Sequence, residues 1–280
     1  MQPAIPPTTR ADSEQRRPRA RRREHAQHHT EPTQREHPAA SSVAQRRSLI
    51  TDPCGIGGPR RQTRPMIDEP HDGASSLGEA KETVVALGRR LAADRLVVGT
   101  AGNVSVRTGG LVAMSPSGIP FDEIDAGDVA VLGLDGTRLS GLAPSSETPL
   151  HLAIYARTDA GAVVHHHGLH SAAVSTVVDE LPAIHYYVTQ LGGPPRVARY
   201  ATYGTPELAE SVDAALAGRT AALLQNHGAV AYGRTPAEAY ARAELVEWLC
   251  ATWATASRLG SPRILTEDEL AAVRERAAQE

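Results

Sequence analysis

Apolar residues recur at regular intervals only beyond residue 75 of this 280-residue chain. Ser76 is a suitable N-cap, Glu79 lies three residues on, and apolar residues follow at helical spacing, which predicts a helix here. Two short runs of alternating apolar and polar residues, 103–107 and 111–114, flank a pair of glycines and predict a β-hairpin.

Further apolar runs predict additional strands and helices. The strands are expected at 129–132, 162–166, 221–224 and 229–232, and the helices at 149–155, from Thr235-Pro236 onward and from Thr266 onward. Strands and helices are interspersed while several strands are joined by short turns. We therefore expect an α/β fold with a mixed sheet covered by helices.

Residues 1–75 are rich in arginine, proline, glutamine, serine and histidine and show no sustained period. Such a composition cannot bury enough apolar area to offset the entropy of ordering it. We predict a disordered N-terminal extension, or an upstream region mis-assigned as coding with the true start near Met66, ahead of a globular domain at 76–280. The arginine-rich run 16–23 could bind nucleic acid or an anionic surface, but no aromatic residue interleaves the arginines, so nucleic-acid binding is not favoured.

Charge and cysteine content narrow the class of protein. Residues 1–65 hold 13 of the 29 basic and 6 of the 32 acidic side chains. Residues 66–280 therefore carry a net negative charge. Cys54 and Cys250 form neither a disulfide framework nor a CxxC motif, which is typical of a reducing compartment. No run of 18 apolar residues is present. We expect a cytoplasmic protein without a membrane span.

Histidines concentrate in the stretch 165–170. Residues i and i+2 of a strand point to the same face, so His165 and His167 could chelate one ion while His166 points away. His227, which follows another predicted strand and precedes a glycine, is the best candidate for a third ligand. Three imidazoles and an open fourth position are typical of catalytic zinc. The spacing alone leaves a chance cluster of surface histidines equally open.

Glu147 follows two serines at the start of a predicted helix. The free backbone N–H groups and the dipole of a helix N-terminus favour an anion there. Three loops rich in glycine, amide and hydroxyl groups, at 99–103, 115–118 and 145–146, contain no lysine and would suit a phosphate held by neutral donors. Both features also have a plain structural interpretation, a capping role for Glu147 and tight turns for the loops.

Taken together, seven stretches resemble the class II aldolase/adducin family across residues 77–277. They are GTAGNVSVR (99–107), SPSGIPF (115–121), PSSE (144–147), AVVHHHGLHSAAVS (162–175), LPAIHYYV (181–188), YATYGTPELAE (200–210) and LLQNHG (223–228). Each stretch alone is weak, but their order and spacing are highly specific. The resemblance implies an α/β fold of three layers, α/β/α, with a central mixed, largely antiparallel sheet.

The resemblance also implies a zinc-dependent aldolase that cleaves a ketose 1-phosphate, L-fuculose 1-phosphate or a similar deoxy-sugar phosphate, to dihydroxyacetone phosphate and a small aldehyde. It assigns the Zn²⁺ to His165, His167 and His227, with zinc acting as a Lewis acid. It gives Glu147 two tasks, contact with the metal at rest and proton transfer during the reaction. The only lysine of the chain, Lys81, lies on a predicted helix, which argues independently against Schiff-base chemistry.

Contacts to the substrate follow from the same resemblance. The residues that match the family's phosphate-binding loops are Asn103, Ser117, Gly118, Ser145 and Ser146. Tyr186 matches a tyrosine near the reacting aldehyde. The family's active sites lie between subunits of a cyclic tetramer, so we expect a homotetramer. Relatives also carry a C-terminal tail that supplies polar aromatic and basic groups to the site. No tyrosine follows the last predicted helix here, so we expect closure over the aldehyde end to be weaker or differently built.

Other functions stay open on the same fold. A pentulose-phosphate 4-epimerase or a methylthioribulose-phosphate dehydratase would keep the architecture and change the reaction. Glu147 favours an aldolase, because epimerases that resemble this fold carry aspartate at that position. A non-catalytic, adducin-like module is disfavoured, because a scaffold has no need of three histidines and a carboxylate.

Overall fold

The computed structural model describes residues 76–279, so the segment 1–75 with its predicted disorder and alternative start lies outside the described residues. Within residues 76–279, eight strands form one sheet. They are β1 (Asn103–Thr108), β2 (Leu111–Met114), β3 (Ala130–Gly133), β4 (Arg138–Ser140), β5 (Ala162–His166), β6 (Val197–Ala198), β7 (Ala221–Leu224) and β8 (Gly228–Gly233).

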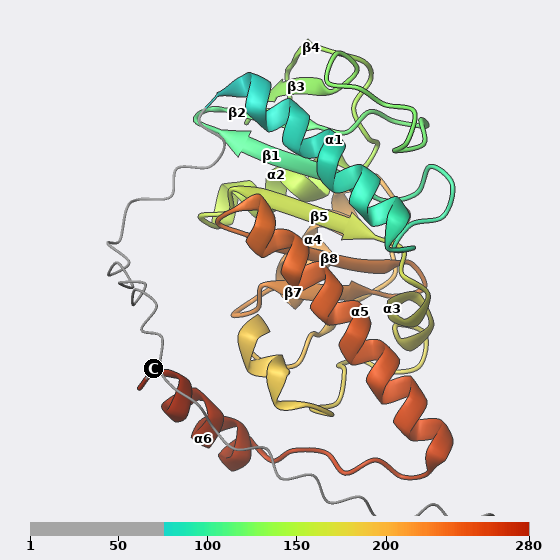
Figure 1. Cartoon of the computed structure of the whole chain (residues 1–280), viewed down its shortest axis with the longest axis vertical. Coiled ribbons are helices and arrows are strands. Elements are labelled where there is room, and N and C mark those ends of the chain that lie inside the picture. The colour runs from blue at the N-terminus through green and yellow to red at the C-terminus, as the bar shows by residue number, and fades with distance from the viewer. Residues whose placement is uncertain (1–75, 280) are drawn as a thin grey trace, which may run out of the picture. The chain divides into compact units, whose positions relative to one another are not determined.

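The sheet is mixed but largely antiparallel, as the sequence resemblance implies. Its strand order is β4-β3-β2-β1-β5-β8-β7-β6 (Figure 1). Every neighbouring pair is antiparallel except β6 and β7, which run parallel. The expected α/β class is confirmed.

Helices cover both faces of the sheet. They are α1 (Leu77–Ala93), α2 (Thr148–Arg157), α3 (Leu169–Val174), the 3₁₀ helix η1 (Tyr186–Leu191), α4 (Pro206–Ala215), α5 (Pro236–Leu259) and α6 (Glu267–Ala277). Helices α1 and α5 cross one face, and α2 and α4 pack on the other (Figure 1). The described part of the chain is thus a three-layer α/β/α structure, and no helix within it has the length and apolarity needed to cross a membrane.

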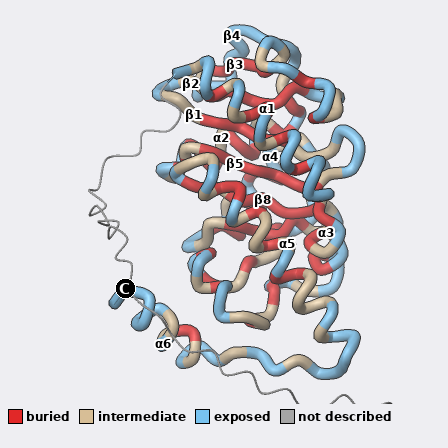
Figure 2. Tube along the Cα trace, in the orientation of Figure 1, coloured by how far each residue is buried: buried red, intermediate tan, exposed pale blue. Residues whose placement is uncertain are grey.

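Two apolar clusters, one on each face, hold the layers together. Along β5 the side chains alternate between them, with Ala162 and Val164 in the cluster under α1 and α5, and Val163 in the cluster under α2 and α4. This alternation is the two-residue period of a strand buried on both faces. Figure 2 shows the buried residues concentrated along the central strands.

Helix starts follow the capping signals in the sequence. Ser76 and Glu79 form a complete capping box at the start of α1, as predicted. Thr235 caps α5, and its side-chain oxygen accepts a hydrogen bond from the Glu238 N–H. Several short elements were not predicted. They are β4, β6, α3, η1 and α4.

Candidate metal centre and substrate pocket

The end of β5 separates its consecutive histidines by the pleat of the strand. His165 is fully buried and points toward Glu147 at the start of α2. His166 points elsewhere: it is buried near Glu247 of α5, and its Nδ1 accepts a hydrogen bond from the Gly168 N–H at 3.1 Å. His167 follows the strand and returns to the same side as His165. The structure therefore excludes His166 from the cluster, as the pleat argument predicted.

Four potential metal ligands meet at this edge of the sheet. The nearest ligand atoms of Glu147, His165, His167 and His227 all lie within 4.8 Å of one another. His165 Nε2 is 2.9 Å from His167 Nε2 and 3.0 Å from Glu147 Oε2, while His227 Nε2 is 3.5 Å from Glu147 Oε1. Such a group can bind a metal ion, because its nitrogen and oxygen atoms lie close enough together to coordinate one ion.

A tight turn brings His227 to the other histidines. Strands β7 and β8 form a hairpin whose turn places Asn226 at φ 56°, a left-handed conformation that asparagine tolerates. Gly228, which follows His227, lies against the end of β5, where a Cβ atom would come within 2.2 Å of the His166 carbonyl oxygen. Only glycine permits this close approach, and His227 is thereby held beside His165.

Burial and charge set the protonation of the cluster. Burial, aided by the neighbouring His165, lowers the pKa of His167 to about 3 and that of His227 to about 4. Both imidazoles are therefore neutral near neutral pH, the form that binds a metal.

Glu147 and His165 behave as a pair. Burial alone would raise the pKa of Glu147, but the charge and hydrogen bond of His165, with His227 and Asn103, hold it well below its ordinary value. Burial would lower the pKa of His165, but Glu147 and the Ala229 carbonyl raise it overall. A proton on His165 Nε2 would occupy the direction in which a metal ion would bind, so metal binding would displace it.

The donor set fits a metal ion. His165 Nδ1 donates to the Ala229 carbonyl at 2.9 Å, which orients Nε2 toward the cluster. Glu147 Oε1 is buried and has no hydrogen-bond partner among residues 76–279. A buried carboxylate oxygen without a partner is costly unless another group satisfies it, and a metal ion between Glu147 and the histidines would do so.

The structure does not support a capping role for Glu147. Glu147 stands at the N-cap position of α2, but its side chain makes no capping hydrogen bond. Instead, Oε2 accepts a hydrogen bond from Asn103 Nδ2 at 2.9 Å and lies against His165. The helix start positions the carboxylate over the histidines.

A pocket of about 450 Å³ opens beside the four ligands. Its lining includes Glu147, His167 and His227. All residues predicted for phosphate binding line it as well, namely Asn103, Ser117, Gly118, Ser145 and Ser146. The structure thus brings these loops together around one cavity.

The sequence interpretation missed some of the lining residues. Tyr200, Tyr203 and Asn226 also line this pocket, and both tyrosines are largely exposed. They lie within two stretches that carry the family resemblance, YATYGTPELAE and LLQNHG. Their proximity to the histidines could therefore have been predicted from these motifs.

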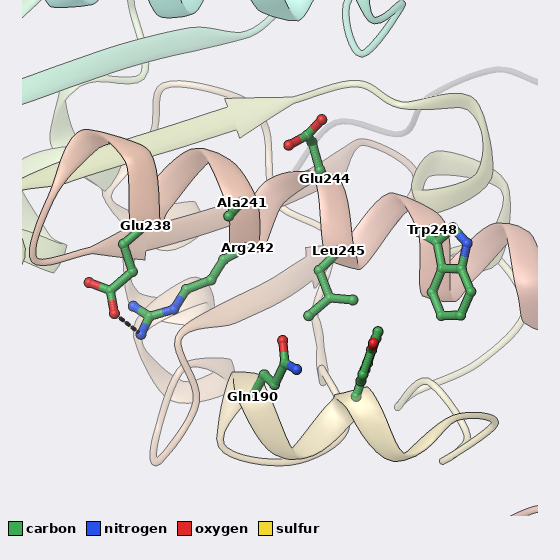
Figure 3. A pocket seen from close by; sticks show the side chains of 8 residues that line it. Gln190, Glu238, Ala241, Arg242, Glu244, Leu245 and Trp248 are labelled. Atoms are coloured by element: carbon green, nitrogen blue, oxygen red, sulfur yellow. Dashed lines mark hydrogen bonds and ion pairs between the residues drawn. The ribbon is translucent and has the colours of Figure 1, made fainter. Parts of the chain in front are cut away.

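Tyr186 is not among the residues that line the pocket of its own chain. It begins η1, is 45% exposed, and stacks on His185. A different, larger hollow lies between η1 and α5 (Figure 3), and the adjacent Tyr187 is one of its lining residues. Trp248 stands at one end of that hollow, and among residues 76–279 its lining includes none of the three candidate histidine ligands.

A three-layer fold that gathers three histidines and a glutamate able to bind a metal, beside a pocket, is typical of metal-dependent α/β enzymes. The family model "Class II Aldolase and Adducin N-terminal domain" matches residues 82–254, and the chain belongs to this family. The family resemblance drawn from the sequence is confirmed.

Individual relatives narrow the activity. The chain is 37% identical over 198 residues to a 5-deoxy-D-ribulose 1-phosphate aldolase of Bacillus thuringiensis serovar kurstaki, covering 69% of this chain and 93% of the relative. It is 40% identical over 181 residues to an L-fuculose phosphate aldolase of Escherichia coli strain K12, covering 64% and 84%. A solved L-fuculose 1-phosphate aldolase matches with a TM-score of 0.69 and 36% identity, covering 71% of this chain and 96% of that one. These relatives support class II aldolase activity, and class II aldolases depend on a metal.

Proposed function

We propose that this protein is a zinc-dependent aldolase that cleaves a ketose 1-phosphate to dihydroxyacetone phosphate and a small aldehyde. The observation that carries the proposal is the Glu147 carboxylate, buried among three imidazoles at the edge of a polar pocket. A carboxylate next to a metal ion and an open cavity can both contact the ion and move a proton to a bound substrate.

The phosphate of the substrate would bind to neutral donors. Among the described residues that line the pocket, none is a lysine or an arginine. The loops instead offer hydroxyl, amide and backbone N–H groups from Asn103, Ser117, Gly118, Ser145 and Ser146. Backbone N–H groups in glycine-rich turns form anion-binding concavities without a cationic side chain.

Zinc is proposed because three imidazoles with a position left for the substrate are typical of catalytic zinc, and that position would open when the Glu147 carboxylate leaves the metal. When bound, the metal supplies Lewis-acid stabilisation of the negative charge that develops on the substrate. The C3–C4 bond breaks, its electron pair stays on C3, and the C4 hydroxyl loses its proton as it becomes an aldehyde. The Glu147 carboxylate, which is unprotonated at rest, would accept that proton and deliver it to C3, so that the reaction neither gains nor loses a proton.

The relatives suggest which substrates to test first. One is named for L-fuculose phosphate and another for 5-deoxy-D-ribulose 1-phosphate, and both of these are deoxy-sugar phosphates. We propose that the substrate belongs to this class.

A panel of ketose 1-phosphates tests the proposal. The zinc-loaded protein is incubated with fuculose, 5-deoxyribulose, ribulose and rhamnulose 1-phosphates, and released dihydroxyacetone phosphate is measured. We expect cleavage of at least one deoxy sugar and none by the His227→Ala variant. Epimerised or dehydrated products in place of dihydroxyacetone phosphate would reject the aldolase reaction and favour an epimerase or dehydratase on the same fold.

We further propose that Tyr186 acts in the pocket of another copy of the chain, within a homotetramer. Tyr186 is exposed and does not line its own pocket, while the family resemblance assigns it to the aldehyde end. Co-expression of Glu147→Gln and Tyr186→Phe chains tests this. Mixed oligomers should be more active than the mean of the two variants, because some sites combine both native residues. Activity equal to the mean of the two variants would contradict a shared site.

A further inference from the structure

A row of buried polar side chains lies behind Glu147. Tyr155, Ser105, His151 and Asn103 follow one another and lead to the carboxylate. Neighbouring polar atoms are 2.7 Å apart between the Tyr155 hydroxyl and Ser105 Oγ, 2.7 Å between Ser105 Oγ and His151 Nδ1, and 2.6 Å between His151 Nε2 and Asn103 Oδ1. The last link, from Asn103 to Glu147, is 2.9 Å long.

The backbone explains why these side chains interleave. Asn103 and Ser105 are two residues apart on β1 and therefore share one face of the sheet. His151 and Tyr155 are four residues apart on α2 and share one face of the helix. All four residues are at most 3% exposed. Burial of so many polar groups is tolerated only when each is hydrogen-bonded, and the row satisfies this condition.

The direction of every hydrogen bond in the row follows from its last acceptor. The Glu147 carboxylate can only accept, so the Asn103 amide nitrogen faces it and the amide oxygen faces His151. That oxygen also only accepts, so His151 carries its proton on Nε2 and accepts at Nδ1 from the Ser105 hydroxyl. Ser105 in turn accepts from the Tyr155 hydroxyl. All donors point toward Glu147.

The protonation states agree with this direction. Burial, with a contribution from nearby His165, lowers the pKa of His151 to about 3, so the imidazole carries a single proton near neutral pH. Burial raises the pKa of Tyr155, so its hydroxyl remains a donor.

We propose that His151 is a positioning residue of the active site, an inference that rests on the proposed aldolase function. Its Nε2–H holds the Asn103 amide in the one orientation that presents N–H to Glu147. Rotation of the amide by half a turn would place its oxygen against the carboxylate and its nitrogen against the His151 donor, which is unfavourable at both ends. His151 thereby keeps Glu147 Oε2 hydrogen-bonded and leaves Oε1 directed at the histidines.

Two substitutions of His151 separate positioning from simple filling of space. In His151→Gln the side-chain amide reaches about as far as Nε2 and can donate to Asn103, whereas in His151→Asn it reaches only as far as Nδ1, toward Ser105. Removal of partners that orient the ligands of a metal site costs about 10- to 100-fold in activity. We expect a kcat loss of this size in His151→Asn and recovery of most of it in His151→Gln, with the zinc content unchanged in both.

The control is Tyr240→Phe. Tyr240 is also buried and donates a hydrogen bond to Asp94, but it lies outside the row and away from the pocket. Loss of this hydrogen bond reports the effect of lower stability alone. The activity of Tyr240→Phe should therefore remain at the wild-type level. Equal kcat values in the Gln and Asn variants, or activity that follows the unfolding midpoint across all three variants, would overturn the positioning role.

A measurement independent of turnover separates this inference from the proposed function. Nitrogen-15 NMR of the histidine side chains reports which ring nitrogen carries the proton. We expect His151 to be protonated at Nε2 only, even if no substrate of the panel is cleaved. Protonation at Nδ1 would overturn the inference while leaving the aldolase proposal intact.

Discussion

Glu147 has two carboxylate oxygens with different surroundings, and this difference suits its proposed tasks. Oε2 is held by the Asn103 amide and by His165. Oε1 has no hydrogen-bond partner among the described residues and lies 3.5 Å from His227 Nε2. One oxygen thus fixes the position of the side chain while the other stays available for a metal ion or a substrate proton.

Replacement of Glu147 by glutamine tests the proton-transfer task. The amide keeps the volume of the side chain but cannot carry the proton, and general acid–base groups contribute about 100- to 10,000-fold to rate. We expect Glu147→Gln to retain zinc on its three histidines and to lose at least about 100-fold in kcat for carbon–carbon cleavage.

The matched control is Glu244→Gln, which alters an exposed glutamate paired with Arg90 on the opposite face of the sheet. It should keep full activity. Unchanged turnover in Glu147→Gln would remove Glu147 from the proton-transfer step.

At the residue scale, local periodicity predicted only part of the site. The two-residue period of a strand was enough to place His165 and His167 on one side and His166 on the other. The position of the third histidine, His227, depends on a turn that folds back onto β5, and sequence periodicity does not reveal such a turn. His151 gave no local signal of its contact with Asn103, because the two residues meet only when α2 packs on β1.

At the scale of elements, long and periodic segments were predicted well and short ones were missed. Strands β4 and β6 have three and two residues, and α3 has six, too few to show a period. Helix α4 is different. Thr205 caps it and Pro206 opens it, the same Thr-Pro signal that predicted α5, so it could have been predicted.

The β7–β8 hairpin is the element on which the position of His227 depends most. A Cβ atom on Gly228 would meet the His166 carbonyl oxygen at 2.2 Å, so Gly228→Ala forces the turn away from β5. Overpacking of this kind costs about 1–3 kcal/mol in the free energy of unfolding. We expect that loss in urea unfolding, together with a lower zinc content, because His227 moves with the turn.

Gly110→Ala is a suitable control for the hairpin, since Gly110 lies in the β1–β2 turn and a Cβ atom there would meet nothing within 4 Å. It should change neither the stability nor the zinc content by a comparable amount. Equal losses of zinc in the two variants would show that the close approach at Gly228 does not position His227.

At the scale of the whole molecule, the site is assembled at one end of the sheet from segments far apart in sequence. Asn103 at the start of β1 pairs with His165 at the end of β5, and His166 pairs with Ala229 of β8. The two apolar clusters that join the layers surround this end without including the four ligands. We therefore expect the fold not to depend on the metal in the way that a small zinc domain does.

Because the apolar clusters do not include the four metal ligands, we can predict how the full-length protein responds to metal removal. A ligand that binds only the folded state adds about 2.7 kcal/mol of stability when its free concentration is about 100 times Kd. Chelation should therefore lower the unfolding temperature and abolish cleavage while the far-ultraviolet circular dichroism stays folded, and added zinc should restore both. In His227→Ala, which lacks one ligand, neither chelator nor zinc should shift the unfolding temperature as far. Loss of the folded signal on chelation alone would show instead that the metal holds the three layers together.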